Sequence, residues 1–345
     1  MATFPSISPA PALLAGARLT ILTEGDFTRG LGHIARCTGF ADLWREWGGS
    51  VAWFVDGDAA ARRLLEGEPA SWGRWHRGPA PAALAGGAVL VDSYTADAAT
   101  LAAIARLAGS VLYLDDGRGC AYPPGLAVDG TPGATAPGTG AAAWALGPDW
   151  HPMRRAFWDV PPRARAADEV GRILLLSGGT DLRGLAPVAL DAALAVFPDA
   201  TIDLVLGAGA PAPSSPLPPS ATVHRDIPAE ALRELMRAAD LAVSAAGQTL
   251  CELARCGTPT LAVAVASNQE RNLAAWSALG AALSADRWSE PDLAGRLRAG
   301  LARLAPRESR ARAAAVGPPV IDGQGTRRLA LWLAETAAEP QRLGA

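Results

Sequence analysis

The segment Thr23–Cys37 combines a glycine-rich turn with a histidine near the expected start of a helix. Its sequence, TEGDFTRGLGHIARC, follows a short apolar run and contains Gly30 and Gly32. Glycines let the backbone approach a ligand closely, and the free N–H groups of a helix start attract an anion such as a diphosphate. A helix N-terminus also disfavours imidazolium, so His33 would be a neutral proton acceptor. The spacing equally fits a His33 that caps the helix or packs under the loop.

Two later segments also join an expected strand to a glycine turn. The first is LSGGTD, Leu176–Asp181, with the pair Gly178 and Gly179. The second begins SAAGQTLCELARC at Ser244 and turns at Gly247. Turns of this kind bring backbone N–H groups to the carboxyl end of a strand, where open α/β sheets bind ligands.

A helix is expected from about Gln248, and its first two turns carry polar side chains. Its N–H groups and the Thr249 hydroxyl could bind an anion. Glu252 lies one turn further and could accept both hydroxyls of a ribose. The simpler interpretation is that Glu252 is an acidic residue that stabilises the start of the helix.

The composition excludes several classes of protein. The chain has 345 residues, of which 50% are apolar and 19% charged, with 31 basic and 34 acidic side chains and a net charge of -3. Such a chain can bury a large core and is not disordered. Near-neutral charge argues against a nucleic-acid partner. All basic residues are arginine, so no lysine can form a Schiff base or act as a general base.

Nothing in the sequence indicates a metal, a cofactor or a membrane span. The four cysteines, Cys37, Cys120, Cys251 and Cys256, have neither zinc-site nor disulfide-framework spacing. The N-terminus lacks a basic region, and no run of about 18 apolar residues follows. We expect a cytoplasmic monomer without stable membrane insertion.

Short apolar runs alternate with longer stretches of helical period, a pattern typical of parallel α/β sheets. Strands are expected, from the apolar runs, at Arg18–Thr23, Val51–Val55, Ala88–Val91, Val111–Leu114, Arg172–Leu176, Thr201–Leu206, Thr222–Val223, Leu241–Ser244 and Thr260–Ala264. Residues 120–143, rich in Gly, Pro, Ala and Thr, predict a long irregular loop outside the core. The pattern restarts after 160–167, which indicates two doubly wound domains with a cleft between them.

Seven motifs occur in order between Arg18 and Leu333: GLGHIARC, VDSYTAD, YLDDG, LGPDWHPMRRAFW, LLSGGTD, ADLAVSAAGQTLCELARCGTPTLAVAVASNQERN and IDGQGTRR. This succession resembles the PseG family of UDP-sugar hydrolases from pseudaminic acid biosynthesis and, more distantly, the MurG-like glycosyltransferases. The resemblance implies a GT-B fold, in which two Rossmann-like domains face each other across a cleft. Residues 18–160 would form the domain on the sugar side, and residues 168–335 the domain that binds UDP.

The resemblance also implies roles for individual residues. His33 corresponds to the general base that activates a water molecule. The resemblance places Tyr94 and Asn268 near the sugar, and the remaining substrate-binding residues would be Gly30, Gly32, Arg36 and Gln269. The nucleotide-binding residues would be Gly178, Gly179, Gly247, Gln248, Thr249 and Glu252. The implied reaction releases UDP from a UDP-linked 2,4-diacetamido-2,4,6-trideoxyhexose, without a metal or another cofactor.

Three other functions remain open from the residues. A GT-B glycosyltransferase would use the same base to deprotonate an acceptor hydroxyl. A non-catalytic nucleotide-sugar binding protein would explain the glycine loops but not His33. A metal-dependent transferase could use Asp56-Gly57-Asp58, although such triplets after strands are usually turns. Asp115 and Asp116 are expected to hydrogen-bond the next turn, and His76, His151 and His224 lack ligand spacing and receive no role.

Overall fold

The strands form two parallel sheets, one from each half of the chain. A computed structural model describes residues 14–78, 81–163, 166–181, 183–207, 209–213 and 216–338. The first sheet has the order β3-β2-β1-β4-β5-β6-β7, with β1 Arg18–Gly25, β2 Ser50–Gly57, β3 Ala70–Trp72, β4 Ala88–Asp92, β5 Ser110–Leu114, β6 Leu126–Asp129 and β7 Ala143–Leu146. The second has the order β10-β9-β8-β11-β12-β13, with β8 Arg172–Leu176, β9 Thr201–Leu206, β10 Ala221–Arg225, β11 Leu241–Ala245, β12 Thr260–Ala264 and β13 Ala282–Arg287.

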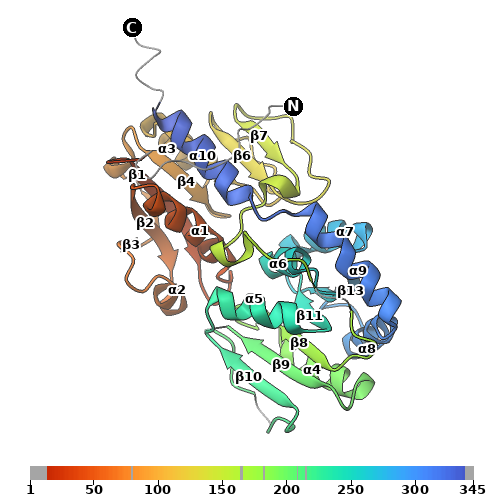
Figure 1. Cartoon of the computed structure of the whole chain (residues 1–345). Coiled ribbons are helices and arrows are strands. Elements are labelled where there is room, and N and C mark those ends of the chain that lie inside the picture. The colour runs from red at the N-terminus through yellow and green to blue at the C-terminus, as the bar shows by residue number, and fades with distance from the viewer. Residues whose placement is uncertain are drawn as a thin grey trace.

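Helices cover the sheets of both domains (Figure 1). The helices are α1 Gly32–Glu46, α2 Ala59–Leu64, α3 Ala98–Leu107, α4 Leu185–Val196, α5 Ala229–Ala238, α6 Gln248–Cys256, α7 Glu270–Leu279, α8 Leu293–Leu304, α9 Arg307–Val320 and α10 Gly325–Ala338. Short 3-10 turns occupy Trp75–Arg77, Ala82–Leu84, Pro148–Trp150, Arg155–Phe157 and Ser267–Gln269. The expected pair of doubly wound domains is therefore confirmed.

The order of strands fixes where loops can meet. In each sheet the order reverses between two neighbouring strands, β1 and β4 in the first and β8 and β11 in the second. These strands are buried along most of their length, as strands covered on both faces must be. Loops leave such a pair in opposite directions and open a crevice at the carboxyl ends. The glycine turns singled out in the sequence follow β1, β8 and β11.

Helix α10 packs on the first domain although it follows the strands of both sheets in the sequence. Leu329 and Leu333 are fully buried, and the Ser110 hydroxyl at the start of β5 donates a hydrogen bond to the Leu333 carbonyl, 3.1 Å away. Figure 1 shows α10 beside the first sheet, while α9 lies at the side of the second domain, where it packs on α6 and α8. The chain therefore crosses between the domains twice.

The prediction for residues 120–143 was wrong in one respect, because they contain a core strand. β6 is completely buried and pairs in parallel with β5 and β7. Tyr122 stacks on Tyr113 with ring centroids 4.8 Å apart. Both rings belong to the same buried cluster as Ala127 of β6. Four residues between glycine-rich turns carry too weak a pattern to separate a short buried strand from a loop. The short β3 and the strands β7 and β13 were missed as well.

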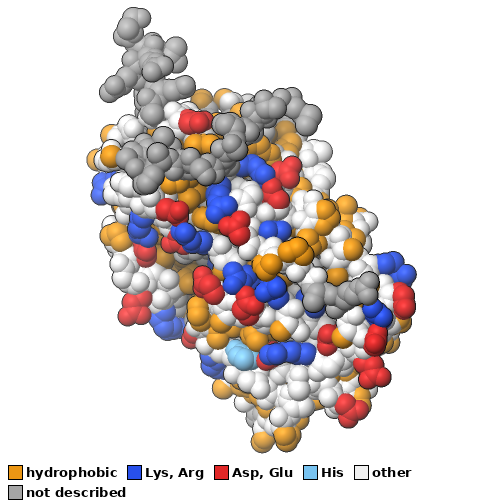
Figure 2. Space-filling model, viewed as in Figure 1, with side chains coloured by type: hydrophobic (Ala, Val, Ile, Leu, Met, Phe, Trp, Pro, Cys, Tyr) orange, Lys and Arg blue, Asp and Glu red, His pale blue; other side chains and the backbone are white. Residues whose placement is uncertain are grey.

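The face of the molecule seen in Figure 2 shows no single dominant charge. On the face in Figure 2, acidic and basic side chains are interspersed over the described residues. Within the same described part of the chain, no helix has both the length and the apolar character needed to cross a bilayer.

Candidate functional site

Two adjoining cavities open between the carboxyl ends of the two sheets. The smaller has a volume of about 220 Å³ and the larger about 630 Å³. Seven residues line both cavities and form the wall between them: Leu31, Gly32, Arg36, Gly178, Gly179, Gln248 and Thr249. Six of these seven are residues that the sequence analysis assigned to substrate or nucleotide.

His33 is the second residue of α1 and lines the smaller cavity. Its Nδ1 lies 2.5 Å from a carboxylate oxygen of Asp92, and its ring meets the Tyr94 ring edge-on with centroids 4.4 Å apart. No side chain caps α1, whose N-cap residue is Leu31, so His33 is not a helix cap. Among the described residues, Nε2 has no hydrogen-bond partner. When Nδ1–H donates to Asp92, the lone pair of Nε2 is free to accept a proton.

Asp92 ends β4 and is fully buried. Besides His33, it accepts hydrogen bonds from Nε and Nη2 of Arg36, both at 2.6 Å. Burial alone would raise the pKa of Asp92, but the charges of Arg36 and His33 hold it well below its usual range. The carboxylate is therefore ionised at neutral pH and fixes the orientation of the His33 ring.

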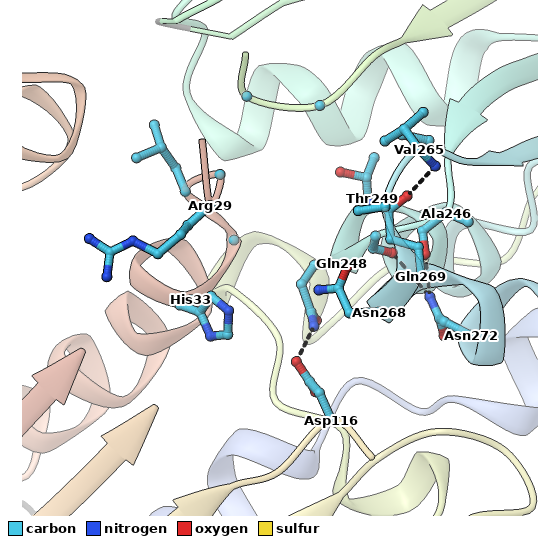
Figure 3. A pocket seen from close by; sticks show the side chains of 18 of the residues that line it. Arg29, His33, Asp116, Ala246, Gln248, Thr249, Val265, Asn268, Gln269 and Asn272 are labelled. Carbon is cyan, nitrogen blue, oxygen red and sulfur yellow. Dashed lines mark hydrogen bonds between the residues drawn. The ribbon is translucent and has the colours of Figure 1, made fainter. Parts of the chain in front are cut away.

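Asp116 belongs to the site, contrary to the expectation that it serves a turn. Both of its oxygens lie 2.7 Å from Nη1 of Arg36, and it accepts a hydrogen bond from the Tyr94 hydroxyl at 3.2 Å. It reaches across the cleft to Nε2 of Gln248 at 3.5 Å (Figure 3). Asp116 lines the smaller cavity, and its φ of +50° lies in the left-handed region. Asp115, in contrast, binds the Gly119 N–H and the Tyr122 hydroxyl, as expected of a turn residue.

Further contacts join the domains beside the smaller cavity. The Asn268 side-chain amide donates to the Tyr94 hydroxyl at 3.1 Å, so these two predicted sugar-side residues meet. Arg271 of α7 forms an ion pair of 2.5 Å with Asp129 at the end of β6. Gln269 lines the cavity and accepts a hydrogen bond from the Val265 N–H.

The glycine turns have the backbone geometry that the sequence suggested. Gly30 and Gly178 adopt φ values of +81° and +86°, a region that side chains disfavour. Gly247 is the N-cap of α6, and no side chain caps that terminus. The N-terminus of α6, with Gln248 and Thr249, therefore faces the wall between the two cavities without a capping side chain of its own.

Glu252 lines the larger cavity and is buried there against an arginine that sequence reasoning missed. Both of its oxygens are held at 2.7 Å by Nε and Nη2 of Arg154. Burial would lower the pKa of Arg154, but the Glu252 carboxylate raises it overall. The loop Asp226–Pro228 lines the same cavity. The signal for Arg154 was present in the motif LGPDWHPMRRAFW, 98 residues before Glu252.

His151 also lies in the wall of the larger cavity, although no role was assigned to it. Its side chain is buried, and burial lowers its pKa to about 4. The backbones of Gly130 and Gly325 pack so closely on it that a Cβ at either position would collide with His151. It therefore sits, uncharged at neutral pH, where the chain passes between the domains.

The other acidic candidates have local structural partners. Asp56 pairs with Arg29, and Asp58 caps α2 by accepting hydrogen bonds from the N–H groups of Ala60 and Ala61. In the described ranges of the chain, no group of three or more His, Cys, Asp or Glu side chains is arranged to hold a metal ion.

Comparison of the sequence with protein-family models and with curated proteins found no match. Comparison with solved structures found MurG from Acinetobacter baumannii, with a TM-score of 0.62 and 16% identity over 93% of this chain and 100% of that one. The calicheamicin glycosyltransferase CalG4 is similar, with a TM-score of 0.62 and 14% identity over 96% and 100%. So is the spinosyn rhamnosyltransferase SpnG in complex with thymidine diphosphate, with a TM-score of 0.54 and 14% identity over 93% and 96%. The chain has the GT-B fold that these enzymes share.

Proposed function

We propose that the protein is an enzyme that hydrolyses a UDP-sugar and releases UDP and the free sugar. The observation that carries this proposal is the buried His33–Asp92 pair, in which the histidine lines the smaller cavity and has a free Nε2. A carboxylate that orients a histidine in this way makes the ring an effective base. A protein that only binds a nucleotide sugar has no use for such a pair.

The two cavities suggest how the substrate lies. The nucleoside would occupy the larger cavity, with its ribose at Glu252 and its base beside Asp226–Pro228. The diphosphate would lie against the wall that the cavities share, at the glycine loop after β8 and the start of α6. The sugar would then extend into the smaller cavity, between Tyr94 and Asn268. In this arrangement residues 168–335 hold UDP and residues 18–160 supply the base, as the sequence resemblance implies.

The reaction follows from these positions. A water molecule held by Nε2 of His33 attacks the anomeric carbon and forms a new C–O bond. The proton of the water passes to Nε2, and the positive ring is stabilised by Asp92. The bond between the anomeric carbon and the diphosphate oxygen breaks, and its electron pair leaves with UDP. Helix and loop N–H groups at the shared wall stabilise the charge on the leaving group.

The smaller cavity, with a volume of about 220 Å³, has room for a sugar ring and a water molecule. The motif succession points to a 2,4-diacetamido-2,4,6-trideoxyhexose as the sugar, and hence to pseudaminic acid or related nonulosonic acid biosynthesis in the cytoplasm.

The second candidate is a GT-B glycosyltransferase that uses a UDP-sugar donor. It is favoured by the structural similarity, since MurG, CalG4 and SpnG all share this fold. In that case His33 would take the proton of an acceptor hydroxyl instead of water.

A panel of UDP-sugars separates the candidates. The purified protein is incubated with each UDP-sugar without any acceptor, and free sugar and UDP are measured. We expect stoichiometric release of both from the diacetamido sugar. Release only after an acceptor is added would identify a transferase, and no turnover with tight UDP binding would identify a binding protein.

The variant His33→Asn tests the proposed base. It should lower turnover by about 10² to 10⁴-fold and leave UDP affinity almost unchanged, because only proton transfer is lost. Hydrolysis at close to the parental rate would remove His33 from the mechanism.

A further inference from the structure

Four arginines line the smaller cavity, and three of them are neutralised by carboxylates. The pairs are Arg29 with Asp26 and Asp56, Arg36 with Asp92 and Asp116, and Arg271 with Asp129. These three guanidinium groups are held in place by the protein itself and leave little charge for a ligand.

Arg183 is the fourth, and it differs from the others. It is exposed, and no carboxylate of the described residues pairs with it. Its guanidinium lies over the ring of Trp288, 4.4 Å from the ring centroid. Stacking occupies the flat face of a guanidinium and leaves the N–H groups along its edge free. Arg183 is thus a positioned cation with unused donors beside the cavity.

The place of Arg183 in the chain indicates which anion it meets. It lies just after the glycine loop that follows β8 and just before α4. Gly178 and Gly179 of that loop belong to the wall shared by the two cavities. A diphosphate that bridges the cavities passes this loop, and the fork of an arginine matches two phosphate oxygens.

We propose that Arg183 binds the diphosphate of the substrate and neutralises the charge that develops on the leaving nucleotide. This inference rests on the proposed function, because it requires a bound nucleoside diphosphate. When the bond to the anomeric carbon breaks, its electron pair goes to the diphosphate oxygen, and donors already in place stabilise that charge without rearrangement. The chain has no lysine, so arginine alone can supply a permanent positive charge here.

The test compares ligands that differ only in the number of their phosphate groups. Binding of UDP, UMP and uridine to the full-length protein and to Arg183→Ala is measured by calorimetry. We expect Arg183→Ala to bind UDP about tenfold more weakly, as the loss of a charge-assisted contact implies, and uridine within about twofold of the parent. Arg183→Lys keeps the positive charge but loses the forked pair of N–H donors. Its affinity for UDP should therefore lie between those of the parent and of Arg183→Ala. Arg298→Ala is the matched control, because Arg298 is exposed on α8 of the same domain and lines neither cavity.

Other outcomes overturn the inference in distinguishable ways. If Arg183→Ala binds UDP as tightly as a parent that hydrolyses UDP-sugar, the inference fails and the proposed function stands. Equal weakening of uridine and UDP would mean that Arg183 supports the fold or the base site. If Arg183→Ala leaves UDP binding unchanged and raises KM only for a UDP-sugar whose sugar carries a carboxylate, Arg183 contacts the sugar. A parent that binds no nucleoside diphosphate refutes the proposed function and this inference with it.

Discussion

In the proposed reaction, the imidazole of His33 and the carboxylate of Asp92 act together, because the acid orients the ring that would accept the proton. Asp92 also balances the buried charge of Arg36. Removing the carboxylate would leave that guanidinium with Asp116 alone, and uncompensated buried charge is strongly destabilising. For this reason His33→Asn tests the chemistry more cleanly than any change at Asp92.

The first prediction concerns Glu252, whose proposed contact is with the ribose. Glu252→Gln should weaken UDP binding about tenfold, because hydrogen bonds to a charged group contribute about 1.5–3 kcal/mol. Turnover at saturation should change little, since the ribose contact is the same in the ground and transition states. Calorimetry and steady-state kinetics measure the two effects. Glu234→Gln, on the exposed surface of α5, serves as the control.

Glu252 also pairs with Arg154, so a thermal melt must accompany this experiment. A melting temperature close to the parental one shows that weaker binding is not loss of fold. If UDP affinity is retained while turnover collapses, Glu252 does not contact the ribose but acts at the reacting centre.

The second prediction concerns His151. Its pKa is lowered to about 4 in the folded protein, against about 6.5 in an unfolded chain. Between these pH values the unfolded state binds a proton that the folded state does not, so stability falls as the pH falls through this window. From pH 7 to pH 5, this group should cost about 2 kcal/mol of unfolding free energy. Urea denaturation at both pH values measures it.

The variant His151→Asn should show a smaller loss between the same pH values. Titration of the parental imidazole by NMR checks the cause directly and does not depend on whether the variant folds. An imidazole that titrates near pH 6.5 would contradict the prediction.

Sequence reasoning found the residues that belong to local patterns and missed their distant partners. His33 and Gln248 lie at the starts of helices that follow glycine turns. In such segments the neighbouring residues alone indicate a helix N-terminus that can bind an anion. The contacts of Arg36 with Asp92 and Asp116 join residues 56 and 80 positions apart. Nothing in the local sequence says which buried acid an arginine will meet, because strand order decides it.

In the proposed site, fixed backbone groups at the wall shared by the two cavities would stabilise the charge of the diphosphate. The uncapped N-terminus of α6 and the turn at Gly178–Gly179 present N–H groups together with the cation of Arg183. We therefore predict that hydrolysis is unchanged by EDTA, because the leaving diphosphate needs no bound cation. Activity is measured after dialysis against the chelator. Loss of activity with recovery in Mg²⁺ or Mn²⁺ would contradict this prediction and the assignment of the wall.

The strands of each domain differ in how well they could be predicted. β8, β9 and β12 have the expected bounds, and β1 and β2 extend beyond theirs. These are apolar runs of ordinary length between clear turns. β6 has four residues and is defined by pairing with β5 and β7 rather than by its own pattern. Its last residue, Asp129, forms the ion pair with Arg271 across the cleft. Because the strand was not predicted, this contact beside the smaller cavity was not predicted either.

Polar contacts between the two domains lie on the side of the smaller cavity. We predict that Arg271→Ala, which removes the ion pair with Asp129, raises KM for the UDP-sugar about threefold, because a partly exposed ion pair contributes about 0.2–1 kcal/mol. Small-angle scattering without ligand should show a more open particle. Arg287→Ala is the control, since Arg287 pairs with Glu270 inside one domain. Equal effects of both changes would exclude a specific role for the contact across the cleft.

The return of α10 to the first domain has a consequence for synthesis of the protein. Leu329 and Leu333 fill the core of the domain that is translated first, yet they are translated after the strands of both sheets. The first sheet therefore keeps an exposed apolar surface, at the place that α10 later covers, while about two hundred further residues are made. Until α10 has been made, the nascent chain should be a target for chaperones. A fragment that stops before Gly325 should aggregate, even though it contains every strand of both sheets.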